Sequence, residues 1–293
     1  MKTRTEKEIF DLINKFVKAD SRIRVVLLNG SRANPSIQKD IFQDYDIACF
    51  VTDVEPYLIE NNVVPYFGET IIVEQPNFGP WPPDDADGSY HNYNMQFVDG
   101  NRIDLTFYNI EKLVEQCKDS LSKVLIDKDN LCLMLPPSSE SSYFILEPSK
   151  VQFNGCCDAF FFAIGSHIPK TIWRKQLPLL KSYLEGWLRE PVQLMLSWEI
   201  GIKTGFSKSI GAKGKYLEKF LESERWEQYL RTYVDSDYEN IWDSIFAFYE
   251  IFVESASVVA EEYNFIFPEE NAVKVLSFLK HVKELPDKAE RIY

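Results

Sequence analysis

The spacing of apolar residues changes from a helical period to a strand period near the start of the chain. Between Thr5 and Asp20 the apolar residues recur three and four positions apart, as on one face of a helix. Thr5 followed by Glu8 is a capping-box sequence, which indicates where this helix begins. The next apolar run, 23–28, is short, rich in β-branched residues and followed by the turn sequence Asn29-Gly30-Ser31. We therefore predict a helix that ends near residue 20, then a strand that runs into a tight loop.

Four more apolar runs in the first half have the length of strands. They cover residues 46–51, 71–73, 93–98 and 102–107. The last two flank Asp99-Gly100-Asn101, which contains the Asp-Gly dipeptide favoured in hairpin turns. Residues 75–87 include four prolines and are predicted to form a loop. The first half is therefore expected to be a mixed α/β unit with about five strands.

The texture of the sequence changes beyond the paired prolines at 136–137. Long aromatic-rich segments of helical length follow, such as 187–203, 226–233 and 241–263. A chain of 293 residues with 45% hydrophobic residues can bury two moderate cores. We predict an α+β fold in two domains: residues 1–145 with the mixed sheet, and residues 146–293 as an all-α helical bundle.

The charge balance bears on the kind of partner. The formal net charge is −13, which argues against a protein that coats nucleic acid, because phosphate backbones are bound by surplus Lys and Arg. A cationic or neutral partner fits better, although the charge is equally explained by solubility alone. The sequence shows neither a secretory signal nor a run of about 18 apolar residues. We expect a cytoplasmic protein with no membrane contact and no obligate protein partner.

The five cysteines match neither a zinc-binding spacing nor a disulfide framework. They are Cys49, Cys117, Cys132, Cys156 and Cys157. The adjacent pair Cys156-Cys157 could act in redox chemistry, but free cysteine packs as a small hydrophobe, which favours burial in a helix. We expect reduced thiols.

Acidic residues on the second predicted strand suggest a metal site. Because side chains at i and i+2 share one face of a strand, the carboxylates of Asp44 and Asp46 point the same way. Mg²⁺ binds through one or two carboxylates together with substrate phosphates. The turn at Gly30-Ser31, which twelve residues separate from Asp44, can bring backbone N–H groups and a hydroxyl close to phosphate oxygens. The combination predicts a site for a nucleoside triphosphate.

A third acid, Asp104, lies between the apolar residues Ile103 and Leu105 of another predicted strand. An aspartate in a central strand is unfavourable unless it has a role. It could join the metal site. Alternatively, it could be an edge-strand acid or a partner of Arg102.

These motifs together resemble the nucleotidyltransferase superfamily of the DNA polymerase β type, with Gly-Ser, a spacer, Asp-x-Asp and a distant third acid. More narrowly, the chain is similar to the aminoglycoside 6-adenylyltransferases, which inactivate streptomycin. The resemblance extends over nearly the whole chain and is carried by residues 22–35 (RIRVVLLNGSRANP), 42–47 (FQDYDI), 99–106 (DGNRIDLT), 125–129 (LIDKD) and 196–207 (LSWEIGIKTGFS).

The resemblance implies Mg²⁺-dependent transfer of AMP from ATP to a hydroxyl of an aminoglycoside. Asp44 and Asp46 would bind Mg²⁺, and Asp104 would act as general base and could share a metal. Gly30, Ser31 and Arg32 would hold the phosphates. The first domain would then be catalytic, and the helical domain would bind the acceptor.

Lys170 and Arg174, four positions apart on a predicted helix, are candidates for binding the outer phosphates. A solvated basic face explains them equally well. Lys and Arg predominate over 170–219, whereas Asp and Glu predominate over 222–270. A basic segment for triphosphate and an acidic one for a polycationic acceptor would suit the reaction, but solvated helix faces explain the same distribution.

The chain departs from the family pattern where the acceptor should bind. Asn154-Gly155 replaces an acidic pair before the two cysteines, and Ala159 replaces a glutamate after them. Loss of these carboxylates should weaken or redirect binding of a cationic acceptor. Asp158 and the cluster Asp84, Asp85 and Asp87 could compensate. The alternatives are an adenylyltransferase acting on another small-molecule or protein hydroxyl, and a non-catalytic nucleotide-binding module.

Overall fold

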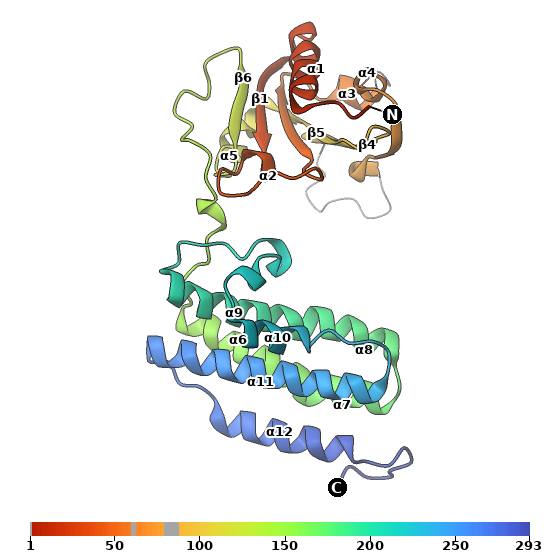
Figure 1. Cartoon of the computed structure of the whole chain (residues 1–293), viewed down its shortest axis with the longest axis vertical. Helices are drawn as coiled ribbons and strands as arrows, with labels where there is room; N and C mark the ends of the chain where they lie inside the picture. Colours follow the sequence, from red (N-terminus) through yellow and green to blue (C-terminus); the bar gives the residue numbers. More distant parts are fainter. Residues whose placement is uncertain (1, 60–62, 79–87) are drawn as a thin grey trace. The chain divides into compact units, whose positions relative to one another are not determined.

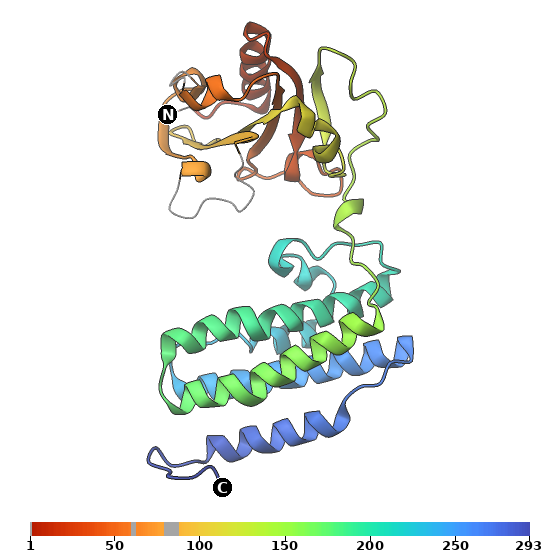
Figure 2. The ribbon, with the colours of Figure 1, turned by 180° about the vertical axis from the view of Figure 1, so that it is seen from behind.

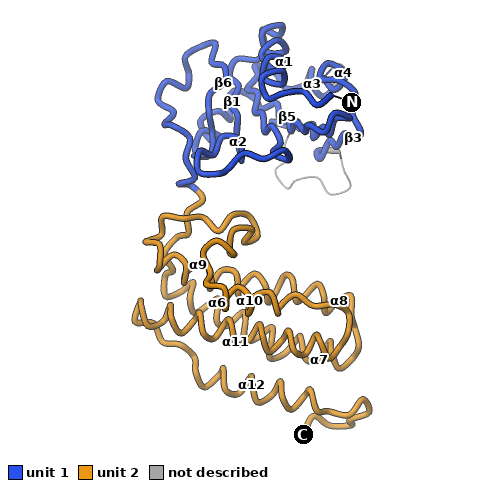
Figure 3. Tube along the Cα trace, viewed as in Figure 1, with its two compact units in different colours: residues 1–142 blue, residues 143–293 orange. Residues whose placement is uncertain are grey.

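The computed structural model describes residues 2–59, 63–78 and 88–293 (Figure 1). The chain divides into two compact units, residues 1–142 and residues 143–293 (Figure 3). The sequence predicts a domain boundary between residues 145 and 146. Each unit is described by itself below.

Within its described residues, the first unit contains six strands and several helices. Its strands are β1 (Ile23–Asn29), β2 (Tyr45–Val51), β3 (Thr70–Glu74), β4 (Tyr90–Phe97), β5 (Arg102–Asn109) and β6 (Lys123–Asp127). Its α-helices are α1 (Glu6–Ala19), α2 (Gly30–Ala33), α3 (Glu55–Ile59), α4 (Val63–Phe67) and α5 (Leu113–Gln116). Short 3₁₀ turns occur at η1 (Pro76–Phe78) and η2 (Ile110–Lys112), and η3 (Ser141–Tyr143) spans the junction between the units.

The strands form one mixed sheet in the order β3-β4-β5-β2-β1-β6. β2 and β5 are parallel, and every other neighbouring pair is antiparallel. The expected count of about five strands omitted β6. This strand lies at the sheet edge, its five residues are exposed or half-buried, and its apolar run is limited to residues 124–126.

One face of the sheet is apolar and is covered by α1, α3 and α4. Ile9, Ile13 and Val17 of α1 are buried against this face. The predicted capping box is present, with Thr5 and Glu8 bonded to each other's backbone N–H groups. The two side chains accept hydrogen bonds from backbone N–H groups that would otherwise be unpaired at the start of the helix. The other face carries polar side chains near β2, β5 and β4, and these form the candidate site.

The second unit is helical, as predicted. Its α-helices are α6 (Lys150–Phe162), α7 (Ile168–Trp173), α8 (Leu177–Tyr183), α9 (Arg189–Thr204), α10 (Ser223–Leu230), α11 (Tyr238–Tyr263) and α12 (Glu269–Lys283) (Figure 2). Two five-residue π-helical turns, η4 (Ala163–His167) and η5 (Leu184–Leu188), join α6 to α7 and α8 to α9. The 3₁₀ turns η6 (Ala212–Gly214) and η7 (Leu217–Lys219) follow α9.

Aromatic side chains hold the helical core together. Phe160 of α6 stacks on Phe252 of α11 with ring centroids 3.8 Å apart. Glu199 of α9 is buried and accepts hydrogen bonds from Arg225 of α10 and Ser255 of α11. Burial of this carboxylate is tolerable because its charge is paired and its oxygens are bonded. No helix within the described ranges is long and apolar enough to cross a membrane.

All five cysteines are free thiols. Cys156 and Cys157 lie in α6, where both are buried in the helical core. Burial raises the pKa of each thiol to about 12. Thiols with so high a pKa stay protonated at neutral pH, whereas the thiolate is the reactive form. The adjacent pair therefore packs in the core, as expected for free cysteines.

Candidate active site

Three aspartates meet on the polar face of the sheet. β2 and β5 pair in a parallel register that places Asp46 directly beside Asp104. Asp44 precedes β2 by one residue and shares a face with Asp46. Carboxylate oxygens of the three residues lie within 4.8 Å of one another, and each residue is only partly exposed. The structure therefore brings together the three acids that the sequence singles out, in an arrangement that could hold a hard divalent cation.

The turn after β1 approaches the same carboxylates. Asn29, the last residue of β1, is the register partner of Asp46. Gly30 then turns with φ of +66° and opens the short helix α2, which also contains Ser31. A Cβ at Gly30 would overlap the Oδ2 atom of Asp46. Only glycine allows this backbone conformation and this close approach together, so the strand-to-turn geometry depends on it.

The charged form of Asp46 is disfavoured by burial and by its position among the other two carboxylates. Burial, together with repulsion from Asp44 and Asp104, raises the pKa of Asp46 to about 7. Two neighbouring carboxylates disfavour a third negative charge, and a bound cation would reverse this effect. The three carboxylates and their spacing fit a hard divalent cation.

Arg102 supplies the nearest positive charge. Its guanidinium donates two hydrogen bonds to Asp104, from Nε at 2.8 Å and from Nη2 at 2.7 Å. Nε also lies 3.8 Å from a carboxylate oxygen of Asp44. The pairing of Asp104 with Arg102 that the sequence left open is therefore present, and it coexists with membership of the acid cluster.

Arg32 directs its guanidinium toward the segment that leads into β2. Its side chain is 9% exposed, and its guanidinium donates to the main-chain carbonyls of Gln43 and Asp44. The guanidinium also stacks over the Tyr45 ring at 3.8 Å. These contacts hold the chain that leads into β2, so Arg32 fixes the position of Asp44 from behind.

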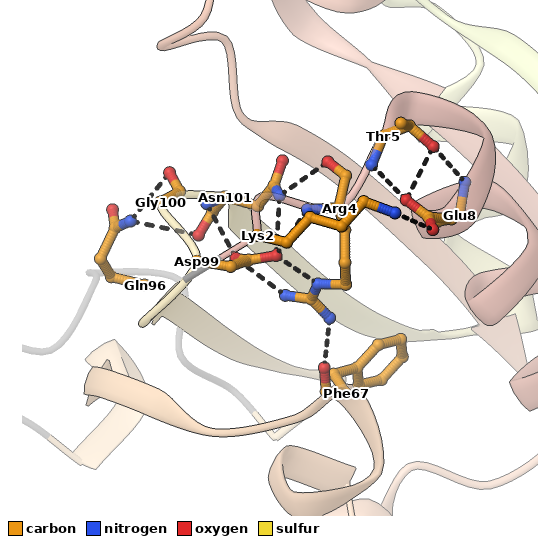
Figure 4. Close-up of polar contacts among 9 residues, drawn as sticks. All are labelled: Lys2, Arg4, Thr5, Glu8, Phe67, Gln96, Asp99, Gly100 and Asn101. Carbon is orange, nitrogen blue, oxygen red and sulfur yellow. Dashed lines mark hydrogen bonds and ion pairs between the residues drawn. The ribbon is translucent and has the colours of Figure 1, made fainter.

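A second anchor fixes the hairpin between β4 and β5. Arg4 donates from Nε to Asp99 at 2.6 Å and from Nη1 to the carbonyl of Phe67 (Figure 4). Asn101 bonds both to Asp99 and to the carbonyl of Arg4. Although burial by itself would raise the pKa of Asp99, the hydrogen bonds from Arg4 and Asn101 bring it well below its usual range. The predicted turn is thereby attached to the segment before α1, and β5 begins from a fixed point.

The row of polar side chains continues past Asp104 onto two further strands. Asn94 of β4 is the register partner of Asp104, and Glu74 of β3 is the partner of Asn94. Asn94 donates from Nδ2 to Glu74 at 3.0 Å. Neither residue was predicted as part of the site. The alternation of polar and apolar residues over 92–97, combined with the hairpin turn, was a signal that could have placed Asn94 opposite Asp104.

Lys170 and Arg174 lie in the second unit. Lys170 belongs to α7 and Arg174 caps its C-terminal end. Both are exposed and line one cavity of about 540 Å³, together with Trp173, Phe278 and the C-terminal tail. A second cavity of similar volume contains Asp235, Asp243 and Glu250 from the acidic segment. Ala159 lines a third, largely apolar cavity with Phe162 and Trp187. Asp84, Asp85 and Asp87 lie outside the described residues.

Comparison with known proteins gives a consistent picture. A family model described as streptomycin adenylyltransferase matches residues 3–282. The chain is 34% identical to an aminoglycoside 6-adenylyltransferase of Campylobacter jejuni, over 90% of this chain and 91% of that protein. It is 33% identical to one of Staphylococcus aureus, over 90% and 94%. A crystal structure of an aminoglycoside 6-adenyltransferase from Bacillus subtilis is 27% identical, covers 96% of this chain and is itself covered completely, with a TM-score of 0.47.

Proposed function

Because the chain belongs to the streptomycin adenylyltransferase family, a family of nucleotidyltransferase enzymes, we propose that it transfers AMP from ATP to a hydroxyl of a streptomycin-like aminoglycoside, with Mg²⁺ as cofactor. The observation that carries the proposal is the cluster of Asp44, Asp46 and Asp104, whose ligand oxygens lie within 4.8 Å of one another. We propose that the reaction takes place in the cytoplasm, where ATP is available.

The residues of the first unit can be given roles in this reaction. Asp44 and Asp46 would hold Mg²⁺, and Gly30 and Ser31 would hold phosphate oxygens through backbone N–H groups and a hydroxyl. Bound Mg²⁺ would neutralise the triphosphate and fix its orientation. Asp104 would accept the proton of the acceptor hydroxyl while the hydroxyl oxygen bonds to the α-phosphorus. The bond from that phosphorus to the bridging oxygen then breaks, and pyrophosphate leaves with the electron pair.

The helical unit would bind the acceptor. The cavity lined by Asp235, Asp243 and Glu250 supports this part of the proposal, because carboxylates attract the amino or guanidino groups of an aminoglycoside. Lys170 and Arg174 would contribute to binding the outer phosphates. That role rests only on their charge and on the cavity that they share.

The direct test incubates the protein with ATP, Mg²⁺ and a panel of aminoglycosides while pyrophosphate release and product mass are followed. We expect streptomycin to gain the mass of one AMP. Asp44→Asn, Asp46→Asn and Asp104→Asn should each lower kcat by about a thousandfold or more, since each removes a group that acts directly on the reacting phosphate or hydroxyl. Asp11→Asn, on the exposed face of α1, is the matched control and should keep full activity.

Other outcomes would point to the alternatives. Turnover of ATP with another hydroxylated acceptor, but with no aminoglycoside, would identify an adenylyltransferase of different specificity. Tight binding of Mg-ATP without turnover on any acceptor would identify a nucleotide-binding module that lacks catalysis.

A further inference from the structure

The polar face of the sheet does not end at the acid cluster. β4 alternates between buried and half-buried residues along its whole length, with Asn92, Asn94 and Gln96 on the less buried side. This is the side to which Asp104 points, because register partners lie on the same face. Beyond β4, the edge strand β3 presents the exposed carboxylate of Glu74 on the same side.

The result is one row across four strands, composed of Asp46, Asp104, Asn94 and Glu74. Neighbouring strands lie about 4.8 Å apart, so Glu74 is roughly 10 Å from Asp104 along the row. That span matches the separation of a hydroxyl and a cationic group on different parts of a small polyhydroxylated molecule. The side of Asp104 toward β1 is occupied by Asp46 and Gly30, which leaves the β4 side for the acceptor.

The two carboxylates at Asp104 and Glu74 differ in whether a cationic side chain pairs with them. Asp104 is paired with Arg102. Glu74 receives a hydrogen bond from the neutral amide of Asn94 but forms no ion pair with any residue in the described parts of the chain. An exposed carboxylate that is oriented by an amide and lacks a cation is suited to bind a cation from outside.

We infer that Asn94 and Glu74 form the acceptor subsite of the first unit, in which Glu74 binds an amino or guanidino group of the acceptor and Asn94 binds a hydroxyl between that group and the reacting one. The inference rests on the proposed function, because it takes the reacting hydroxyl to lie at Asp104. It assigns the acceptor a chemical class, a polyhydroxylated cation, and a direction across the sheet from β5 toward β3.

The test measures steady-state kinetics and equilibrium binding of streptomycin for the wild-type protein and for Glu74→Gln, Glu74→Asp and Asn94→Ala. Glu74→Gln should raise the KM for streptomycin about tenfold, with kcat and the KM for ATP changed less than twofold. Glu74→Asp keeps the charge and should recover most of the loss. Raising the salt concentration should narrow the difference between wild type and Glu74→Gln, since a charge interaction at an exposed site is screened. Asn94→Ala should raise the KM about threefold.

The matched control is Glu55→Gln, which removes an exposed carboxylate from α3 in the layer that covers the opposite face of the sheet. It should leave every constant unchanged. If the wild type adenylylates streptomycin and Glu74→Gln does so with an unchanged KM, the subsite is wrong while the proposed function stands. An equal increase in the KM for ATP would also overturn the inference, because Glu74 would then act on the nucleotide.

A wild-type protein that transfers no AMP to an aminoglycoside would remove the proposed function. Streptomycin binding would then decide the subsite by itself. Weaker binding to Glu74→Gln than to wild type and Glu55→Gln would support it, and equal or absent binding would overturn it.

Discussion

Arg102 and Asp104 face each other across two parallel hydrogen bonds of 2.8 and 2.7 Å, on the strand that carries the third acid of the cluster. They are two residues apart on β5 and therefore share a face of the sheet. The guanidinium thus neutralises part of the negative charge that would attract a divalent cation. A metal ion that binds the carboxylates must displace the guanidinium or bind beside it.

Removal of Arg102 should therefore strengthen binding of metal in the absence of nucleotide. We expect Arg102→Ala to lower the dissociation constant for Mn²⁺ or Mg²⁺ by about three- to tenfold, because one nearby positive charge is lost. Calorimetric or spin-resonance titration measures this. The control is Arg24→Ala, which removes an arginine paired with Asp129 away from the cluster. Weaker metal binding by Arg102→Ala would show that the arginine assists the cation instead of competing with it.

Gly30→Ala should abolish activity at a moderate cost in stability. The added Cβ would overlap Asp46 and would be held at a φ of +66°. The backbone strain alone is worth about 1 kcal/mol. Gly205→Ala is matched in backbone geometry, with a φ of +61° and nothing within 4 Å of the added atom. Both variants should lose similar stability from strain in chemical denaturation, but only Gly30→Ala should lose AMP transfer, by a hundredfold or more. Full activity in Gly30→Ala would contradict the close approach.

Asp46 should make the stability of the metal-free protein depend on pH. Its pKa is raised to about 7 by burial and by Asp44 and Asp104, so the native state holds the proton more tightly than the unfolded chain. The stabilisation from this proton is complete below the unfolded pKa and is lost as pH rises through 7. Between about pH 5 and about pH 8 the free energy of unfolding should fall by about 2 kcal/mol from this group.

Denaturant titrations across this pH range check the effect. Asp46→Asn should flatten the dependence, and saturating Mg²⁺ should remove it from the wild type. Asp44→Asn should move the midpoint to lower pH, since one of the repelling charges is gone. The same slope in wild type and Asp46→Asn would assign the effect to another group.

Arg4 and Asp99 should protect the first unit at moderately low pH. The pKa of Asp99 is lowered, so its stabilising contribution is present above the unfolded pKa and is lost only as pH falls through the lower folded value. Asp99→Asn should cost about 1 to 3 kcal/mol at neutral pH, because Arg4 loses a charged partner that is 9% exposed. The difference from wild type should shrink as the solution becomes strongly acidic. Asp129→Asn, at an exposed pair, should cause a smaller loss of stability in the same measurement.

The sequence predicted elements whose local signal agrees with their final environment. Local rules predict the capping box at Thr5, the hairpin at Asp99-Gly100 and the strand that follows Asp44 and contains Asp46. β6 was missed, although its apolar run at 124–126 is as long as the run at 71–73 from which β3 was predicted. Its pairing with β1 is what identifies it as a strand. The π-helical turns η4 and η5 were also missed. Their residues are of the same types as those of the flanking α-helices, so no local pattern distinguishes them.

Local sequence spacing predicted only the part of the site that lies on one strand, and not the contacts between strands. Asp44 and Asp46 share a face by spacing alone, but the approach of Asp104 depends on the parallel register of β2 with β5. Arg32 was predicted from its place in a motif. Its contacts with two main-chain carbonyls and the Tyr45 ring were not predicted, because they depend on packing and not on sequence order.

The parallel pairing of β2 with β5 has a consequence for how the enzyme becomes active during synthesis. Among the described residues, two α-helices (α3 and α4), one 3₁₀ turn (η1) and two strands (β3 and β4) lie between the strands that carry Asp46 and Asp104. Antiparallel β1 and β2 can pair as soon as both have left the ribosome. Asp44 and Asp46 nevertheless lack Asp104 until the hairpin of β4 and β5 has formed and β5 has paired with β2. Non-local pairing of this kind forms late because a long loop must close first. A truncated or partly folded chain that lacks β5 therefore contains the turn at Gly30 and two of the three acids, but not the complete cluster.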